Sequence, residues 1–79
     1  MTDQELLARI TINSKVLVGK PVIQGTRLSV EFILQRLAHG ATLDELRQEY
    51  PRLTAEDVQA CLLFASKSLE SVTFVPQPI

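Results

Sequence analysis

A glycine–lysine pair at residues 19–20 is the most obvious candidate for chemistry in this sequence, because such a pair holds phosphates in nucleotide-binding loops. The remainder of that motif is missing. Ser14 stands where the loop needs a glycine, and Pro21 replaces the hydroxyl residue that follows the lysine. We therefore interpret Gly19 and Gly25 as turn residues with positive φ, and Pro21 as the first residue of an edge strand.

Metal-binding and nucleophilic sites have no candidate set of residues either. His39 is the single histidine and Cys61 the single cysteine, and the acids around them show no ligand spacing. His39 falls in the last turn of a predicted helix, where its imidazolium would interact favourably with the helix dipole. The serines and Cys61 lack a base and an orienting partner. We therefore predict no enzyme activity, no cofactor and no metal site.

Charge is unevenly distributed along a chain whose net charge is only −1. Every charged residue in the segment 9–30 is basic, whereas residues 31–70 carry seven acids against four bases. Lys15, Lys20 and Arg27 could track phosphates as a DNA-binding arm or wing does, or they could form a solvated surface. Arg27 could instead be held by an acidic partner such as Glu31. The sequence alone leaves these alternatives open.

The elements that would position these residues begin with short strands. Residues 10–28 are rich in Val, Ile and Thr and contain glycine and proline turn signals, so we expect strands at 9–13 and 22–24. A helix should then run from Ser29, whose hydroxyl can cap it, to Gly40. The apolar residues of this helix follow helical spacing and are Val30, Ile33, Leu34, Leu37 and Ala38.

Two further helices follow the first. Thr42 and Glu45 form a capping-box pair, and a proline ends that helix after about two turns. Thr54 and Asp57 mark the start of the third helix, which should be the longest and should end before the tail that begins at Val72. The apolar positions of the third helix predict a core-facing stripe of Val58, Cys61, Leu62, Ala65 and Leu69.

Three large apolar side chains have no place in this predicted core. At about 100° per residue, Phe32 lies opposite the stripe of the first helix and Leu63 opposite that of the third, with Phe64 beside it. Phe74 belongs to an extended, uncharged tail whose prolines prevent a helix and which is either docked or frayed. The N-terminal segment and the tail could cover these side chains, but we favour a protein interface that includes a second copy.

Three closely linked helices, with a short turn at residues 51–53, have the outline of a helix-turn-helix domain. We therefore expect a mainly α fold, with short N-terminal strands followed by a three-helix bundle. If the domain reads double-stranded DNA, the first turn of the third helix should enter the major groove, where Thr54 and Gln59 could contact it. Glu56 and Asp57 face phosphates badly, so this contact is weaker than the fold suggests.

Size and composition place all these elements in one domain. The 79 residues comprise a strand-and-turn segment at 9–28, three helices at 29–71 and an extended tail at 72–79. A chain this small has a thin stability margin as a monomer, so we expect a homodimer. The acidic N-terminus lacks an export signal, no apolar run reaches about 20 residues, and the cysteine is alone, which together predict a cytoplasmic protein without a membrane partner.

Three stretches of the chain carry distinctive sequence motifs. They are residues 19–28 (GKPVIQGTRL), the pairs and runs Ile33-Leu34 and Leu37-Ala38-His39-Gly40, and residues 50–58 (YPRLTAEDV). Together they resemble the bacterial family known as domain of unknown function 433, over about residues 9–65. The resemblance implies a homeodomain-like or winged helix-turn-helix fold. It also implies an antitoxin of the VapB type, whose partner is a PIN-like ribonuclease toxin.

The first turn departs from the pattern of that family. Asn13-Ser14 stands where an aspartate-proline pair is common, and Val18 stands where a second glycine often precedes Gly19. From the residues and the resemblance we expect a small non-catalytic regulator of the antitoxin type, which pairs with a toxin and binds its own operator DNA. The alternative is a protein-interaction domain with the same fold and no DNA role.

Overall fold

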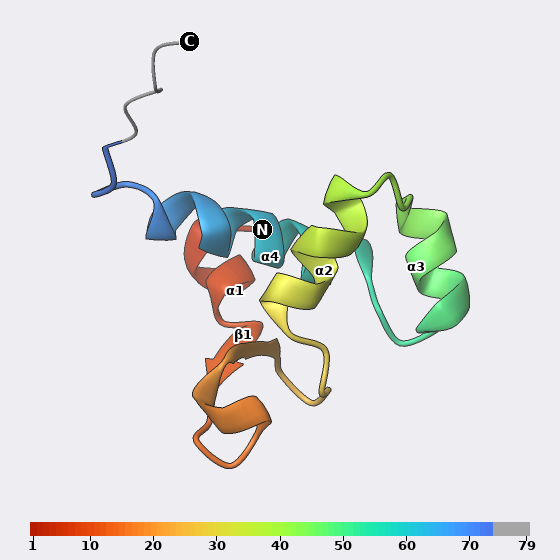
Figure 1. Ribbon diagram of the computed structural model, residues 1–79, viewed down its shortest axis with the longest axis horizontal. Coiled ribbons are helices and arrows are strands. Elements are labelled where there is room, and N and C mark those ends of the chain that lie inside the picture. The colour runs from red at the N-terminus through yellow and green to blue at the C-terminus, as the bar shows by residue number, and fades with distance from the viewer. Residues whose placement is uncertain (74–79) are drawn as a thin grey trace, which may run out of the picture.

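Four helices and one β-hairpin make up residues 1–73, the part of the chain that the computed structural model describes (Figure 1). Figure 1 shows α1 beside α4, with the hairpin at one end of the domain and α3 on the far side of α2. The predicted mainly helical fold with a short N-terminal sheet is therefore confirmed. The elements follow one another as α1 (Asp3–Leu7), β1 (Ile10–Ile12), the 3-10 turn η1 (Leu17–Gly19), β2 (Pro21–Ile23), α2 (Val30–Ala38), α3 (Leu43–Glu49) and α4 (Ala55–Ser68).

Hydroxyl residues begin the three longer helices, as the sequence predicted. Ser29 starts α2 and accepts a hydrogen bond from a backbone N–H of its first turn at 2.9 Å. Thr42 starts α3 and Thr54 starts α4 with complete capping boxes, in which the returning carboxylates are Glu45 and Asp57. The predicted starts of these helices are confirmed, and α4 is the longest helix of the described residues.

The two strands pair in antiparallel register, with Ile10 opposite Ile23 and Ile12 opposite Pro21. Strand β1 is shorter than predicted because Asn13 already belongs to a turn, where its side-chain oxygen accepts the backbone N–H of Lys15 at 2.9 Å. Strand β2 begins at Pro21, which confirms the interpretation of Pro21 as the first residue of a strand, and it ends at Ile23, one residue before the predicted end. The hairpin therefore lies where the sequence placed it, with its boundaries moved by one residue.

Left-handed backbone conformations occur at the predicted glycines and also before one of them. Gly19 and Gly25 have φ values of +78° and +80°, which confirms their predicted role in turns. Leu17 and Val18 share this region, with φ values of +49° and +55°. Val18 is 95% exposed, so little packing offsets the strain of a β-branched residue there, which costs roughly 1–2 kcal/mol. This turn therefore stores strain at Val18, where a glycine would adopt the same backbone without it.

The sequence prediction missed α1, so the described chain has four helices instead of three. Thr2 caps this helix, and it forms a capping box with Glu5 through hydrogen bonds of 3.2 Å in each direction. Five residues are too few to show helical periodicity, which needs a window of about 11 residues. The helix packs against α4, and this contact makes the N-terminal segment part of the domain.

A single cluster of buried side chains joins β2 and the three longer helices. Cys61 belongs to it, and its burial, assisted by the negative charge of Asp57, raises the pKa of the thiol to about 12. The thiol is therefore protonated at neutral pH and behaves as a small apolar side chain. The members of the cluster are Ile23, Val30, Ile33, Leu46, Leu53, Val58 and Cys61.

The predicted core face of α4 is wrong at two positions. Leu62 is 50% exposed and Leu69 is 62% exposed, whereas Ala60, which the prediction left out, is fully buried. The cause is the N-terminal segment, because α1 packs on α4 beside the face that α2 covers. The buried face is therefore turned toward Ala60, and Leu62 and Leu69 lie in solvent.

The prediction that Phe32 and Phe64 lie away from the core is also wrong. Both are half-buried and pack against the core cluster. The ring of Phe32 meets that of Tyr50 edge to face at 5.9 Å, and the Arg36 guanidinium lies 5.9 Å from the centre of the Phe32 ring. A helical projection could not predict the packing of Phe32 and Phe64, because it gives positions around one helix and contains no information on neighbouring elements.

Candidate functional site

The first turn of α4, which was predicted to enter DNA, is occupied by the chain itself. Asp57 is 8% exposed, and its carboxylate accepts the Arg9 guanidinium at 3.0 Å and the backbone N–H of Thr54 at 3.0 Å. The Thr54 hydroxyl in turn accepts the backbone N–H of Asp57 at 3.1 Å and the Arg9 guanidinium at 3.4 Å. Arg9, Thr54 and Asp57 thus form one hydrogen-bonded network that joins the N-terminal segment to α4, which we call the Arg9 network.

The two residues predicted to contact DNA from the third helix have different surroundings. Thr54 is half-buried, and its hydroxyl already has partners in the Arg9 network. Gln59 is exposed on α4, more than one turn further along the helix. Contact of Thr54 and Gln59 with DNA stays a prediction.

The three predicted phosphate contacts have different surroundings. Lys20 donates to Glu31 at 2.8 Å, and this hydrogen bond and the charge of Lys20 hold the pKa of Glu31 below its ordinary value. Glu31 therefore pairs with Lys20. The sequence analysis had offered Glu31 as a partner of Arg27, and that alternative is wrong. Lys15 and Arg27 are exposed, and neither forms an ion pair with any other residue in the range 1–73.

An open apolar groove of about 540 Å³ lies between α2 and the C-terminal half of α4. We call it the α2–α4 groove. Helix α2 contributes Val30, Leu34 and Ala38, which recur at every fourth residue, and α4 contributes Ala65 and Leu69. The groove is therefore formed by the apolar stripes of two neighbouring helices, at the place where those stripes extend beyond the core.

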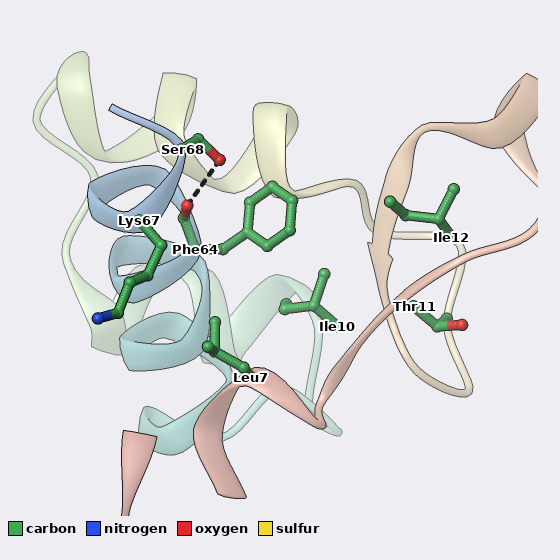
Figure 2. Close-up of a pocket in the computed structure, with 7 residues that line it drawn as sticks. All are labelled: Leu7, Ile10, Thr11, Ile12, Phe64, Lys67 and Ser68. Atoms are coloured by element: carbon green, nitrogen blue, oxygen red, sulfur yellow. Dashed lines mark hydrogen bonds between the residues drawn. The ribbon is translucent and has the colours of Figure 1, made fainter. Parts of the chain in front are cut away.

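Figure 2 shows a second apolar groove, of about 530 Å³, between α4 and the N-terminal segment. Leu7, Ile10 and Ile12 line it from the N-terminal side, and the ring of Phe64 lies opposite them. The hydroxyl of Ser68 donates to the carbonyl oxygen of Phe64 at 2.8 Å. Phe64 and Ser68 line the α2–α4 groove as well, so Phe64 separates the two grooves.

A third groove, of about 430 Å³, lies between the β2–α2 turn and the α3–α4 turn, and we call it the turn groove. Arg27 lines it from the first turn and Arg52 from the second. Of the residues predicted to bind DNA, Arg27 is the one that lines a groove described here. Sequence reasoning missed Arg52, because residues 51–53 were interpreted only as a connection. A charged side chain at the centre of a tight turn was the available signal.

The predicted interface residues do not share one surface. Phe32 and Phe64 serve the core as described above, and Leu63 is half-buried. Phe74 lies outside the described residues, as does the tail from residue 74 onward. Leu62 and Leu69 are exposed apolar residues that the interface prediction missed, because the sequence placed them in the core. Of these two, Leu69 lines the α2–α4 groove.

The surfaces described so far are suited to binding. Within residues 1–73, no three side chains of His, Cys, Asp or Glu gather closely enough to hold a metal ion. In the same range, no helix has the length and apolar character that crossing a membrane requires. The arrangement offers two apolar grooves and one groove with arginines at its walls.

Fold and grooves together define a small, mainly helical domain with an N-terminal hairpin and open apolar surfaces. The family described as "Protein of unknown function (DUF433)" matches residues 10–65, and the chain belongs to this family. The structure is similar to the crystal structure of a DUF433 member protein from Anabaena variabilis ATCC 29413, determined at 2.00 Å resolution. The two share 34% sequence identity with a TM-score of 0.74, over 85% of this chain and 66% of that one. No curated protein matches the sequence.

Proposed function

We propose that this protein is a small non-catalytic binding module that associates with other proteins through the α2–α4 groove. The observation that carries the proposal is that Leu69, which lines this groove beside the half-buried Ala65, is 62% exposed and is left open by its own chain. Leu34 and Ala38 face the same groove from α2. Contiguous apolar surface of this kind is removed from water when a partner binds.

A second copy of the chain is the first partner in this proposal. The small residues Ala38 and Ala65 allow another helix to approach the groove closely. Leu69 stands at the edge of the groove, so a two-fold arrangement can place the Leu69 of each copy against the groove of the other. Full burial of a leucine side chain contributes about 1.5–3 kcal/mol, and a two-fold interface obtains this contribution twice.

A PIN-like ribonuclease toxin is the second partner, as the resemblance to antitoxins of the VapB type implies. In this role the protein is a cytoplasmic dimer that occupies the toxin and binds its own operator. The α3–turn–α4 unit would serve as the helix-turn-helix, with its turn closed by the hydrogen bond from the Leu53 N–H to the Tyr50 carbonyl oxygen at 2.9 Å. Because the Arg9 network occupies the first turn of α4, protein binding is the primary function in this proposal.

Gene neighbourhood gives the first test, because an adjacent reading frame for a PIN-like ribonuclease supports the antitoxin role and its absence contradicts it. Coexpression of that ribonuclease with variants of this chain gives the second test. Wild type and the control Val18→Asp should restore growth, whereas Leu69→Asp should not. Val18 is a matched control because it is an exposed apolar residue that does not line the α2–α4 groove.

The outcomes of the coexpression separate the parts of the proposal. Restored growth with Leu69→Asp would exclude the α2–α4 groove from toxin binding. Failure of the wild type would exclude the antitoxin role itself. A chain that ends at Val72 tests the tail, and if it restores growth as well as the full chain, the tail has no part in the mechanism.

A further inference from the structure

Two unpaired arginines line the turn groove, although they belong to different turns of the chain. Within residues 1–73, the lysines and arginines without an ion pair are Lys15, Arg27, Arg47 and Arg52. Arg27 and Arg52 are both exposed and both line this groove. Because like charges repel, a groove with two unpaired arginines is an attractive site for an anion. We propose that the turn groove binds the phosphodiester backbone of a nucleic acid, with Arg27 and Arg52 as its phosphate contacts.

Both arginines are presented by turns whose backbones are held by hydrogen bonds. On the first turn, the Thr26 hydroxyl donates to the Ile23 carbonyl oxygen at 2.7 Å and accepts the Leu28 N–H at 3.0 Å, so these bonds bracket Arg27. On the second turn, the hydrogen bond between residues 53 and 50 places Arg52 at the third position of a β-turn. Little backbone freedom is therefore lost when an anion binds between the two turns.

The single acid that lines the groove is already neutralised. Glu49 accepts both terminal nitrogens of Arg36, one of them at 3.0 Å. This hydrogen bonding holds the pKa of Glu49 below its ordinary value, so the carboxylate stays charged and stays paired. The charges of Arg27 and Arg52 are therefore uncompensated, in a chain whose net charge is −1. Attraction of a polyanion to this protein would be confined to such a local site.

The lining between the arginines favours a nucleic acid over an acidic peptide. Besides the arginines, Glu49 and the turn residues Gly25 and Thr26, the lining consists of the apolar and aromatic residues Leu28, Tyr50, Pro51 and Leu53. Arginines beside an aromatic ring form the usual surface for a nucleic acid strand, because they contact phosphates while the ring contacts sugars and bases. The Tyr50 ring is fixed in place by its edge-to-face contact with Phe32. This inference is independent of the α2–α4 groove, which shares no lining residue with the turn groove.

Fluorescence anisotropy with a labelled oligonucleotide of about 12 nucleotides, as a single strand and as a duplex, tests this site. The variant is Arg27→Gln with Arg52→Gln, and the control is Arg47→Gln with Lys67→Gln. The control removes the same charge from two exposed residues that do not line the groove. At about 50 mM salt, the variant should weaken binding at least roughly tenfold and the control less than about twofold. The slope of log Kd against log salt should fall by roughly 1.4 for the single strand and 1.8 for the duplex.

The two forms of the oligonucleotide distinguish a single-stranded ligand from a double-stranded one. The form that binds more tightly identifies the ligand of the turn groove. Equal weakening by variant and control would overturn the proposal, as would the absence of any binding by the wild type at low salt. Polyglutamate bound as tightly as the oligonucleotide would show an acidic protein partner instead. Far-UV circular dichroism checks that the variants fold, and backbone amide shifts of Gly25 and Arg52 on addition of the oligonucleotide locate the site in the wild type.

Discussion

The first turn of α4 is tied into the domain, whereas its last two turns present apolar side chains to solvent. At the first turn, Asp57 has a partner on each carboxylate oxygen and is almost completely buried. Near the other end, Leu62 and Leu69 are at least half exposed and have the spacing of a core stripe. The polar end of the helix is therefore used for stability, and the apolar end is available for a partner.

This contrast reverses the usual expectation for the two kinds of residue. Apolar side chains on a helix normally face the core, and charged ones normally face water. In α4 the N-terminal segment reverses the assignment, because Arg9 covers the charged end and α1 packs beside it. A helix of five residues can thus decide which face of a longer helix remains open.

Removal of the Asp57 side chain should have the largest effect on stability. Asp57→Ala takes away the carboxylate that caps α4 and leaves the partly buried Arg9 and the Thr54 N–H without their partner. We expect the free energy of unfolding to fall by about 3 kcal/mol. Urea denaturation measures this change. Glu56→Gln, in the same helical turn and without a salt bridge in the described chain, should cost less than about 0.5 kcal/mol. Similar losses of unfolding free energy for both variants would show that the Arg9 network contributes no more to stability than an exposed acid in the same turn.

The Thr54 hydroxyl gives an intermediate effect. Thr54→Ala should lower the free energy of unfolding by about 1 kcal/mol, because the N–H of Asp57 loses its cap and Arg9 loses one acceptor. Thr54→Ser keeps the hydroxyl and should restore most of this loss. Urea denaturation at neutral pH again measures the difference. Equal stability of all three proteins would mean that the hydroxyl is free to serve another purpose, such as DNA contact.

The exposed pair of Arg36 and Glu49 should give the smallest effect, and it should depend on pH. The hydrogen bonds from Arg36 lower the pKa of Glu49 below its ordinary value of 4.5. A lowered pKa means that the pair contributes its stability above pH 4.5 and loses it as the pH falls through the lowered value. The difference in urea midpoint between wild type and Glu49→Gln should therefore be constant above pH 4.5 and shrink below it. A difference that persists unchanged in acid would show that the pair is not its source.

Local signals in the sequence predicted most of the fold. The hydroxyl caps at residues 29, 42 and 54 act within one helical turn, so Ser29, Thr42 and Thr54 could be identified without any knowledge of tertiary structure. The same capping-box signature was present at Thr2 and Glu5, and α1 could have been found from it.

The candidate sites were less predictable, because they depend on which segments meet. Nothing near Asp57 in the sequence indicates that Arg9 is its partner, since the two residues come together only when the N-terminal segment packs on α4. The exposure of Leu62 and Leu69 has the same cause. The turn groove likewise depends on the approach of two turns that are distant along the chain, so Arg52 could not be linked to Arg27 from sequence.

Sedimentation equilibrium at micromolar concentration tests most directly whether the open end of α4 binds a partner. Wild type and Val18→Asp should both sediment with a mass near twice 8.8 kDa, because neither loses the apolar stripe of the α2–α4 groove. Leu69→Asp places a charge in that stripe and should sediment near 8.8 kDa with an unchanged circular dichroism spectrum. A wild type that remains monomeric throughout this range, or a Leu69→Asp variant that dimerises as tightly as the wild type, would contradict the assignment of the α2–α4 groove as the protein-binding surface.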